Sequence, residues 1–330
     1  MNKLKTRYRV AAMAIVYLMI IVGLAVSAII TTSDASAHGV AKDKSYGVNG
    51  VEGPAHLMNL LKIAQDLEKK ALSGDVEAQY KLGLHYYNGM IVGKDVGKAI
   101  GWLDLAHKQG YLKASDKLGI IYDRYGNTNQ ARITALRFFT VAANGGLAEG
   151  QVNLGVMYYT GRGTDRNYDK ALDLYIKAAK QNSHRAQYYV GIMYELGRGI
   201  GQDYTKALQW YEASADNGNA FAAYNAGLSH EKGRGVPVAK KKAIKYFTMA
   251  SKGGSAQAQF RLGSMYFLGQ GTERNLEDAL LWLTVAKLQG HKNAADAVKH
   301  IRPKMTVAQI TSVNKRIDKV QDAKISRTWF

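Results

Sequence analysis

The sequence predicts an all-α fold, a solenoid of six helix-turn-helix repeats, on three observations. A glycine-containing motif returns every 36 residues, and each copy holds two helical patterns of apolar residues. The chain has three prolines and no sustained alternation of apolar and polar residues, which argues against a sheet. It has no cysteine, so disulfides, zinc-thiolate sites and thiol nucleophiles are excluded and stability must come from packing.

The repeat is easiest to follow at its first position, which is glycine in five copies and asparagine in one. These residues stand 36 apart, at Gly74, Gly110, Gly146, Asn182, Gly218 and Gly254. The copies are therefore 74–109, 110–145, 146–181, 182–217, 218–253 and 254–289. Position 10 is glycine and position 26 is alanine in every copy. A register kept over six copies is not a chance pattern.

Two helices are predicted in each copy. Positions 5, 9, 13 and 16 share one face of a first helix, and positions 26, 29, 30 and 33 share one face of a second. The bulky residue at position 29 is expected to pack against the small residues at positions 10 and 26. Position 1 follows the second helix, where a left-handed cap favours glycine, and Asn182 is the common substitute.

The two ends of the array differ from the repeats. Residues 54–73 are predicted to form an N-terminal capping helix, because Leu67 and Ala71 continue the second-helix face of an incomplete copy. Residues 290–330 hold a partial copy that Pro303 breaks. A last, C-terminal capping helix then opens with a capping box at Thr306 and Gln309. Residues 38–53 contain four glycines and are predicted to be a flexible linker.

The first 37 residues have the composition of a targeting segment. Four basic residues precede an uncharged run of 21 residues, Val10 to Ile30, which as a helix would span ~30 Å, about the hydrocarbon thickness of a bilayer. Ala35–Ala37 supplies the small-x-small pattern of a signal-peptidase site. Residues 1–37 are therefore predicted to be a cleaved signal peptide or a membrane anchor through residues 10–30. The basic flank predicts that the rest is periplasmic, anchored to an inner membrane with its C-terminal domain outside the cytoplasm, or secreted.

The remaining chain is strongly basic. Residues 1–37 hold four basic residues and one acidic residue, so 41 basic and 25 acidic residues remain, a net charge of +16. Such a charge favours acidic proteins or envelope polyanions as partners. Nucleic acid is not expected as a partner, because a domain outside the cytoplasm rarely meets it.

Several stretches resemble the Sel-one-like repeat family, a relative of tetratricopeptide repeats, over residues 74–289. The matching stretches are AQYKLG at 78–83, AQYYVG at 186–191, AQFRLG at 258–263, GRG at 161–163, DKAL at 169–172 and TKAL at 205–208. The resemblance implies a right-handed α/α superhelix with a concave groove and an adaptor role. One cysteine-rich branch of the family has β-lactamase activity, but this chain has no cysteine, and no enzymatic activity is predicted. Exported bacterial members are similar in their export signal and serve in secretion, motility, polysaccharide export, regulation and host interaction. Copy two departs most, with Tyr125 and Asn127 where glycine is expected.

The partner-binding residues are predicted on the concave wall, at position 14 of the first helix. This position varies from copy to copy, which is typical of a binding face, and it holds Tyr87, Asp123, Tyr159, Glu195, Glu231 and Phe267. Replacing Tyr159 and Phe267 together is expected to weaken partner binding by ~2 kcal/mol with little change in melting temperature. A second candidate surface is the row Arg162, Arg198 and Arg234 in the connectors, where a polyanion could lie.

The functional hypothesis is a protein-binding adaptor on the extracytoplasmic side of a bacterial membrane. The alternatives are a periplasmic regulator of a membrane sensor, a secreted host-interaction factor, and a hydrolase of the β-lactamase-like type. Chance alone predicts about one S-x-x-K match in a chain of this composition, so the two matches at Ser229–Lys232 and Ser312–Lys315, which have no companion motif, do not indicate an enzyme. The eight histidines show no i, i+4 pair on a helix, so neither a metal site nor a cofactor is predicted.

Overall fold

The structure, a computed structural model, describes residues 54–90 and 93–325, and in these ranges every regular element is a helix. The prediction of an all-α solenoid of repeats is confirmed. The first helices of the six copies are α3 Val76–Asn88, α5 Leu112–Tyr125, α7 Ala148–Thr160, α9 His184–Leu196, α11 Ala220–Lys232 and α13 Ala256–Leu268. The second helices are α4 Val96–Lys108, α6 Asn129–Asn144, α8 Tyr168–Ala179, α10 Tyr204–Asp216, α12 Lys240–Lys252 and α14 Leu276–Leu288.

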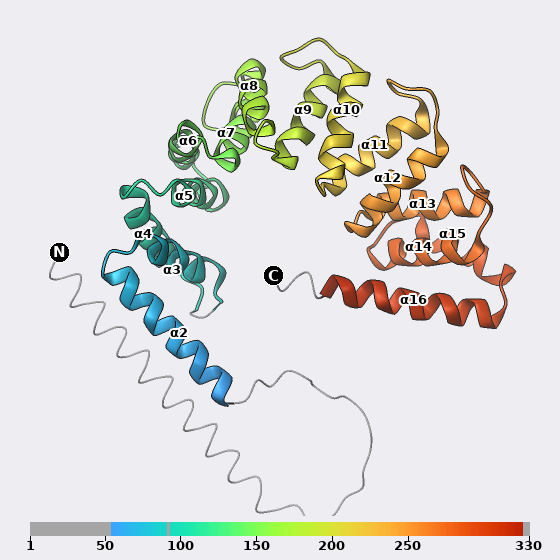
Figure 1. Ribbon diagram of the computed structural model, residues 1–330, viewed down its shortest axis with the longest axis horizontal. Helices are drawn as coiled ribbons and strands as arrows, with labels where there is room; N and C mark the ends of the chain where they lie inside the picture. Colours follow the sequence, from blue (N-terminus) through green and yellow to red (C-terminus); the bar gives the residue numbers. More distant parts are fainter. Residues whose placement is uncertain (1–53, 91–92, 326–330) are drawn as a thin grey trace, which may run out of the picture. The chain divides into compact units, whose positions relative to one another are not determined.

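The two helices of each copy form a hairpin, and each hairpin packs on the next in chain order (Figure 1). Helix α2 Pro54–Leu72 precedes the first hairpin, and Ala71 in its last turn is buried against Ala78 and Leu82 of α3. No helix in the described ranges has the length and apolar composition that a bilayer crossing needs. The predicted membrane segment at residues 10–30 and the linker at 38–53 lie outside the described residues.

The turn after each second helix has the expected backbone geometry. Position 1 is in the left-handed region in every copy, and Asn182, at φ 60°, is the one residue other than glycine with positive φ in the described part of the chain. Asparagine tolerates this conformation better than other residues that carry a Cβ. The prediction that Asn182 replaces a capping glycine is confirmed.

The core of each hairpin is built on the small residues at positions 10 and 26. The alanine at position 26 is at most 2% exposed in all six copies. The bulky side chain that packs on the glycine at position 10 stands at position 30, not at position 29 as predicted. The position 30 residues, all at most 3% exposed, are Leu103, Phe139, Tyr175, Tyr211, Phe247 and Leu283. Position 29 lies at the edge of this core, because its side chain is only partly buried in five of the six copies.

Copy two has a different connector, in the place where the sequence departs from the repeat. Its first helix runs on to Tyr125, and Gly126 at φ −91° replaces the left-handed cap that the other first helices have. A Cβ on Gly126 would lie 2.1 Å from the Cβ of Ala131, so this residue must be glycine for a different reason, the close approach of α6. Helix α6 begins at Asn129, three residues earlier in the repeat than α8 begins in copy three.

Amide pairs connect the two ends of four copies, a feature that the sequence analysis missed. In copies one, three, four and six the glutamine at position 6 accepts a hydrogen bond from the amide at position 36. These pairs are Gln109 to Gln79 at 2.8 Å, Gln181 to Gln151 at 3.0 Å, Asn217 to Gln187 at 3.0 Å and Gln289 to Gln259 at 2.8 Å. In copies three and six the position 6 amide also donates to a carbonyl in the second helix of the preceding copy, and in copy one it donates to the Ala71 carbonyl of α2. The buried glutamine at position 6 thus has a polar partner in its own copy and, in three of the four copies, a second partner in the preceding helix, which satisfies an amide that would be costly to bury alone.

The two copies without this pair lack both of its members. Copy two has Ser115 and Gly145, and copy five has Ala223 and Gly253. The space at each glycine is filled from position 3, since an added Cβ would lie 2.5 Å from Leu112 or 2.4 Å from Ala220. The joint replacement supports a structural role for the pair.

We expect Gln259→Ala to lower the free energy of unfolding by about 1–3 kcal/mol, because it leaves the Gln289 amide and the Ser251 carbonyl without their partner. Urea denaturation measures the change. Gln257→Ala is the matched control, since Gln257 is an exposed residue of the same helix. An equal loss in both variants would contradict the role of the pair.

The C-terminal end closes with the predicted capping box. Helix α15 Ala294–Ile301 is followed by a 3-10 turn at Arg302–Lys304 that contains Pro303, and then by α16 Val307–Ile325. At the start of α16 the Thr306 amide donates to Gln309 Oε1 at 2.9 Å and the Gln309 amide donates to Thr306 Oγ1 at 3.3 Å. Val313 and Ile317 of α16 are buried in the cluster formed by α14 and α15.

Candidate functional site

The exposed face of the first helices runs through positions 4, 8, 11 and 15. Positions 4 and 15 are exposed in all six copies, whereas positions 5 and 9 are buried in all six. At 100° per residue, positions 4, 8, 11 and 15 fall within about 60° of one another, so they form one stripe along each helix. We call the residues at these four positions of the six copies the first-helix stripe.

Position 14, the predicted binding position, lies about 90° from the middle of this stripe. Tyr87 is buried there, and the other five residues at this position are only partly exposed. Position 14 is therefore only partly open to solvent in five copies and closed in copy one. Its side chains turn towards the following copy, where most of them have a polar partner. Whether position 14 contributes to partner binding stays a prediction.

The two candidate surfaces predicted from the sequence contact each other, because the connector arginines bind position 14 side chains. Each connector arginine, at position 17, reaches back to position 14 of the preceding copy. Arg162 pairs with Asp123 at 2.8 Å, Arg198 donates to the Tyr159 hydroxyl, and Arg234 pairs with Glu195 at 3.3 Å. The row is not a set of free cations, since two of its three charges are compensated by carboxylates. Binding of a polyanion there stays a prediction that this pairing weakens.

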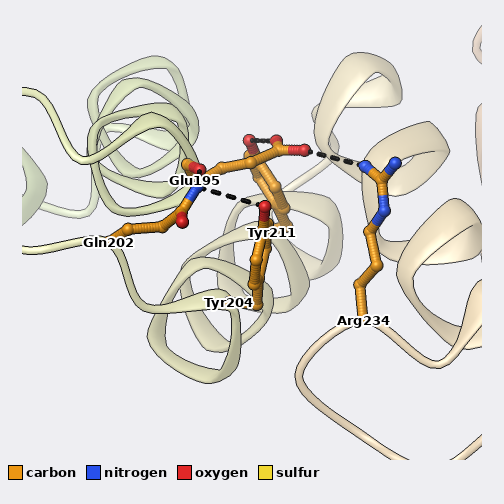
Figure 2. Close-up of polar contacts among 5 residues, drawn as sticks. All are labelled: Glu195, Gln202, Tyr204, Tyr211 and Arg234. Carbon is orange, nitrogen blue, oxygen red and sulfur yellow. Dashed lines mark hydrogen bonds and ion pairs between the residues drawn. The ribbon is translucent and has the colours of Figure 1, made fainter.

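Glu195, at position 14, is held by hydrogen bonds to three other side chains (Figure 2). Its carboxylate accepts from the hydroxyl of Tyr211 at 2.5 Å and from Arg234 at 3.3 Å. The backbone carbonyl of Glu195 accepts from Gln202 Nε2 at 2.8 Å, and the same amide donates to the Tyr204 hydroxyl. Burial, and then the hydrogen bond to Glu195, raise the pKa of Tyr211, so it stays a protonated donor. These hydrogen bonds connect α9 with α10 and with the connector of the next copy.

The remaining position 14 residues follow the same rule with other partners. The Tyr87 hydroxyl accepts from Arg124 at 3.0 Å in the next first helix, and Glu231 pairs with Arg261 at 3.0 Å. Phe267 has no polar group; its ring lies 5.1 Å from the guanidinium of Arg274 in its own copy and 5.8 Å from the ring of His300 in α15, which follows the last copy. Position 14 is thus a contact between copies along the array.

The first-helix stripe has one mainly apolar row beside basic positions. The apolar row is position 11, which holds Leu84, Ile120, Val156, Ile192, Leu228 and Ser264, all partly exposed. The other stripe positions carry seven basic residues, Lys81, Lys113, Lys117, Arg124, Arg185, Lys232 and Arg261, against the two acidic residues Glu77 and Glu149. This surface is complementary to a segment with apolar and acidic side chains.

An aromatic group lies on the same stripe at α9 and α11. Phe221 is 71% exposed, the largest exposure of any aromatic side chain in the described part, and its ring centroid lies 6.2 Å from that of Tyr188. Tyr189 stacks on the buried Tyr175 at 4.8 Å with an interplanar angle of 12°. Exposed aromatic rings held by buried neighbours are typical of interaction surfaces, because they offer area at low entropic cost.

A pocket of about 340 Å³ opens on the stripe across the first helices of copies one to four. Its polar lining is Lys113, Asp116, Lys117, Glu149, Asn153 and Arg185, and its apolar lining is Tyr80, Ile120 and Leu147. Asp116 stands at position 7, where the other copies have Tyr, Val or Phe, and this departure from the repeat was the signal that could have found the pocket.

Asp116 is a buried carboxylate at the base of this pocket. It is 8% exposed and accepts a hydrogen bond from Asn153 Nδ2 at 2.7 Å. Burial raises the pKa of Asp116 above its ordinary value, and the hydrogen bond from Asn153 together with the charge of Lys117 only partly opposes this. An ionised Asp116 therefore carries an energetic cost in the folded chain.

We expect Asp116→Asn to stabilise the folded chain at neutral pH, by roughly 1 kcal/mol. Because the folded-state pKa is raised, the folded chain loses stability as the pH rises through that pKa, and asparagine removes this loss. The gain should be present at pH 8 and should shrink towards pH 4, near the ordinary pKa of 3.8. Urea denaturation at both pH values measures it. A gain that does not change with pH would contradict the assignment.

Metal and hydrolytic chemistry find no support in the described residues. They contain no group of three His, Asp or Glu side chains that could hold a metal ion. His230 is buried, its Nε2 lies 2.8 Å from Glu212 Oε1, and its ring stacks on Tyr246 at 5.6 Å. In the S-x-x-K match at Ser229–Lys232, Ser229 is buried, whereas Lys232 is exposed.

The stacked hairpins and the exposed first-helix stripe define an α/α repeat protein. The Sel1 repeat model matches residues 76–111, 148–183, 184–219, 220–255 and 256–291, which is more than half of the chain. The chain belongs to the Sel1 repeat family, the Sel-one-like family that the sequence resembles. The model does not match the hairpin of copy two, whose connector differs and which supplies Asp116.

Solved structures of other proteins support this assignment. One is c5321, a protective antigen of uropathogenic Escherichia coli with an SLR fold, at 26% identity and a TM-score of 0.67 over 78% of this chain and 56% of that one. The chain thus spans little more than half the length of c5321. Another is a Sel1 repeat protein from Oxalobacter formigenes, at 28% identity and a TM-score of 0.60 over 70% of this chain and 95% of that one. A comparison with curated proteins gave no match.

Proposed function

We propose that the chain is a scaffold that binds an extended segment of a partner protein along the first-helix stripe. Sel1 repeat proteins generally serve as protein-interaction scaffolds. The observation that carries the proposal is the stripe itself, with its apolar row at position 11, its excess of basic residues and its exposed aromatic group. An extended segment fits because each copy presents the same four positions at a regular spacing.

The place of action that we propose is the extracytoplasmic side of a bacterial membrane, as an adaptor. The support is in the sequence, where a basic start is followed by an apolar run from Val10 to Ile30. A reporter active only outside the cytoplasm, fused after residue 330, tests the location. Intact-mass measurement of the mature protein shows whether residues 1–37 are retained. An inactive reporter fusion would contradict the location and leave the scaffold proposal standing.

The scaffold proposal predicts a strong effect of Phe221→Ala on binding. Crosslinking in cells followed by mass spectrometry identifies the partner, and titration with that partner gives the affinity. We expect about tenfold weaker binding, since an exposed aromatic residue in an interface typically contributes 1–2 kcal/mol or more. The melting temperature should hardly change, because Phe221 is 71% exposed.

The matched control is Leu288→Ala. Leu288 is 55% exposed, but it lies at the end of the second helix α14, away from the first-helix stripe. We expect normal binding by this variant. Equal effects of the two substitutions would show that the stripe is not the binding surface.

A further inference from the structure

The pocket on the first-helix stripe is lined by basic side chains without acidic partners, a feature that the general scaffold role does not explain. Lys113 and Lys117 of α5 and Arg185 of α9 line it from two copies that are not adjacent. None of the three forms an ion pair within the described part of the chain, although Lys117 lies 5.6 Å from the centre of the Tyr87 ring. By contrast, two other basic residues of the stripe have acidic partners, Lys81 with Glu77 and Arg261 with Glu231.

The pocket exists because copy two breaks the repeat. Position 7 holds Tyr80, Tyr188, Tyr224 and Phe260 in four other copies, whereas copy two has Asp116, which lines the pocket together with Asn153. Asp116 is shorter, and its carboxylate is turned to Asn153 at 2.7 Å. The result is a recess about 340 Å³ in volume, large enough for a side chain or a chain end.

The charges of the pocket favour an anionic group. Three cations face Glu149 and Asp116, and Asp116 already accepts the Asn153 amide. Lysine and arginine form their strongest hydrogen bonds with carboxylates. The rings of Tyr188 and Tyr189 lie on α9 within one turn of Arg185, so an apolar side chain beside the bound anion would meet an aromatic surface.

We propose that Lys113, Lys117 and Arg185 form a carboxylate-binding site that takes an acidic side chain or the terminal carboxylate of the partner segment. The proposal rests on the proposed scaffold function and names the chemistry of its anchor. The three basic residues hold the carboxylate, while Tyr189 receives the neighbouring apolar side chain. Asp116 shapes the recess and, when ionised, weakens the binding of an anion.

The test uses the purified full-length chain and four fluorescein-labelled pools of random octapeptides. Three pools have a blocked C-terminus and differ only in one central residue, which is Asp, Asn or Lys. The fourth has a central Asn and a free C-terminal carboxylate. Fluorescence anisotropy gives the apparent affinity of each pool. We expect about tenfold tighter binding of the Asp pool or of the free-carboxylate pool than of the blocked Asn pool, and which of the two is preferred identifies the source of the carboxylate.

Variants connect this preference to the pocket. Lys113→Gln combined with Arg185→Gln should abolish it, and Asp116→Asn should strengthen it a few-fold by removing a like charge. The control is Lys180→Gln combined with Lys287→Gln, which removes the same charge from exposed positions at the ends of α8 and α14 and should keep the preference.

Three outcomes would overturn the proposal: no difference between the pools, a preference for the Lys pool, or a preference that survives the pocket substitutions. If the pools bind without any acidic preference and Phe221→Ala weakens them all, the scaffold function stands and only the carboxylate site fails. If no pool binds at all, both proposals fail.

Discussion

Gly155→Leu is expected to lower the free energy of unfolding by about 3 kcal/mol or more, the largest loss among single substitutions considered for this chain. An added Cβ at Gly155 would lie 2.6 Å from the ring of Tyr175, which is fully buried at position 30. The remaining leucine atoms would separate α7 from α8, and partner binding would be lost as a consequence. Circular dichroism during urea denaturation measures the change.

Gly101→Leu is the control for this substitution. Gly101 also lies inside a helix, α4, but an added Cβ there meets no atom within 4 Å. Leucine is the better helix former, so we expect a gain of about 0.5 kcal/mol. If both variants lose stability equally, close approach of the two helices is not the reason for glycine at position 10.

Replacing Tyr159 and Phe267 together with alanine is expected to lower the free energy of unfolding by about 4 kcal/mol. Each ring is half-buried, so each should contribute about half of the 3–5 kcal/mol of a fully buried aromatic residue, and the distant sites should add. Tyr159 packs against Tyr168 at 5.4 Å, and Phe267 against His300 at 5.8 Å. The sequence analysis expected little change in the melting temperature of this double variant, whereas its contacts in the structure lead us to expect a clear decrease.

This double variant distinguishes the two interpretations of position 14. Thermal unfolding followed by circular dichroism should show the loss, and Phe221→Ala should melt like the parent chain. A double variant that keeps its melting temperature but loses partner binding would restore the prediction that position 14 is the binding surface.

The repeat architecture could be predicted from the sequence alone, because its determinants are local. A residue in the left-handed backbone conformation is needed after the second helix of each copy. This requirement is visible in the glycine spacing and in the one asparagine exception, Asn182. The capping box at Thr306 and Gln309 is equally local, since its two members are three residues apart. The copy with a different connector was also visible, at Tyr125 and Asn127.

Contacts between copies were not predictable in the same way. Helical periodicity shows which side of a first helix faces its own hairpin, but not which of the other sides the next copy covers. The rotation from one copy to the next decides this, and it turns Glu195 towards Arg234 instead of towards solvent. The same rotation brings the side-chain amide of Gln151 within 3.4 Å of the Ala143 carbonyl oxygen in the preceding copy.

The sequence by itself determined the fold class, the family, the repeat register and the residues with special backbone geometry, since each depends on a few neighbouring residues. Only the tertiary structure decided that position 14 joins the copies, that the exposed stripe runs through positions 4, 8, 11 and 15, and that Asp116 lies with Lys113 and Arg185 in one pocket. These features arise where two or more copies meet. Their geometry depends on how hairpins stack, and residues about one repeat length or more apart in the chain decide it together.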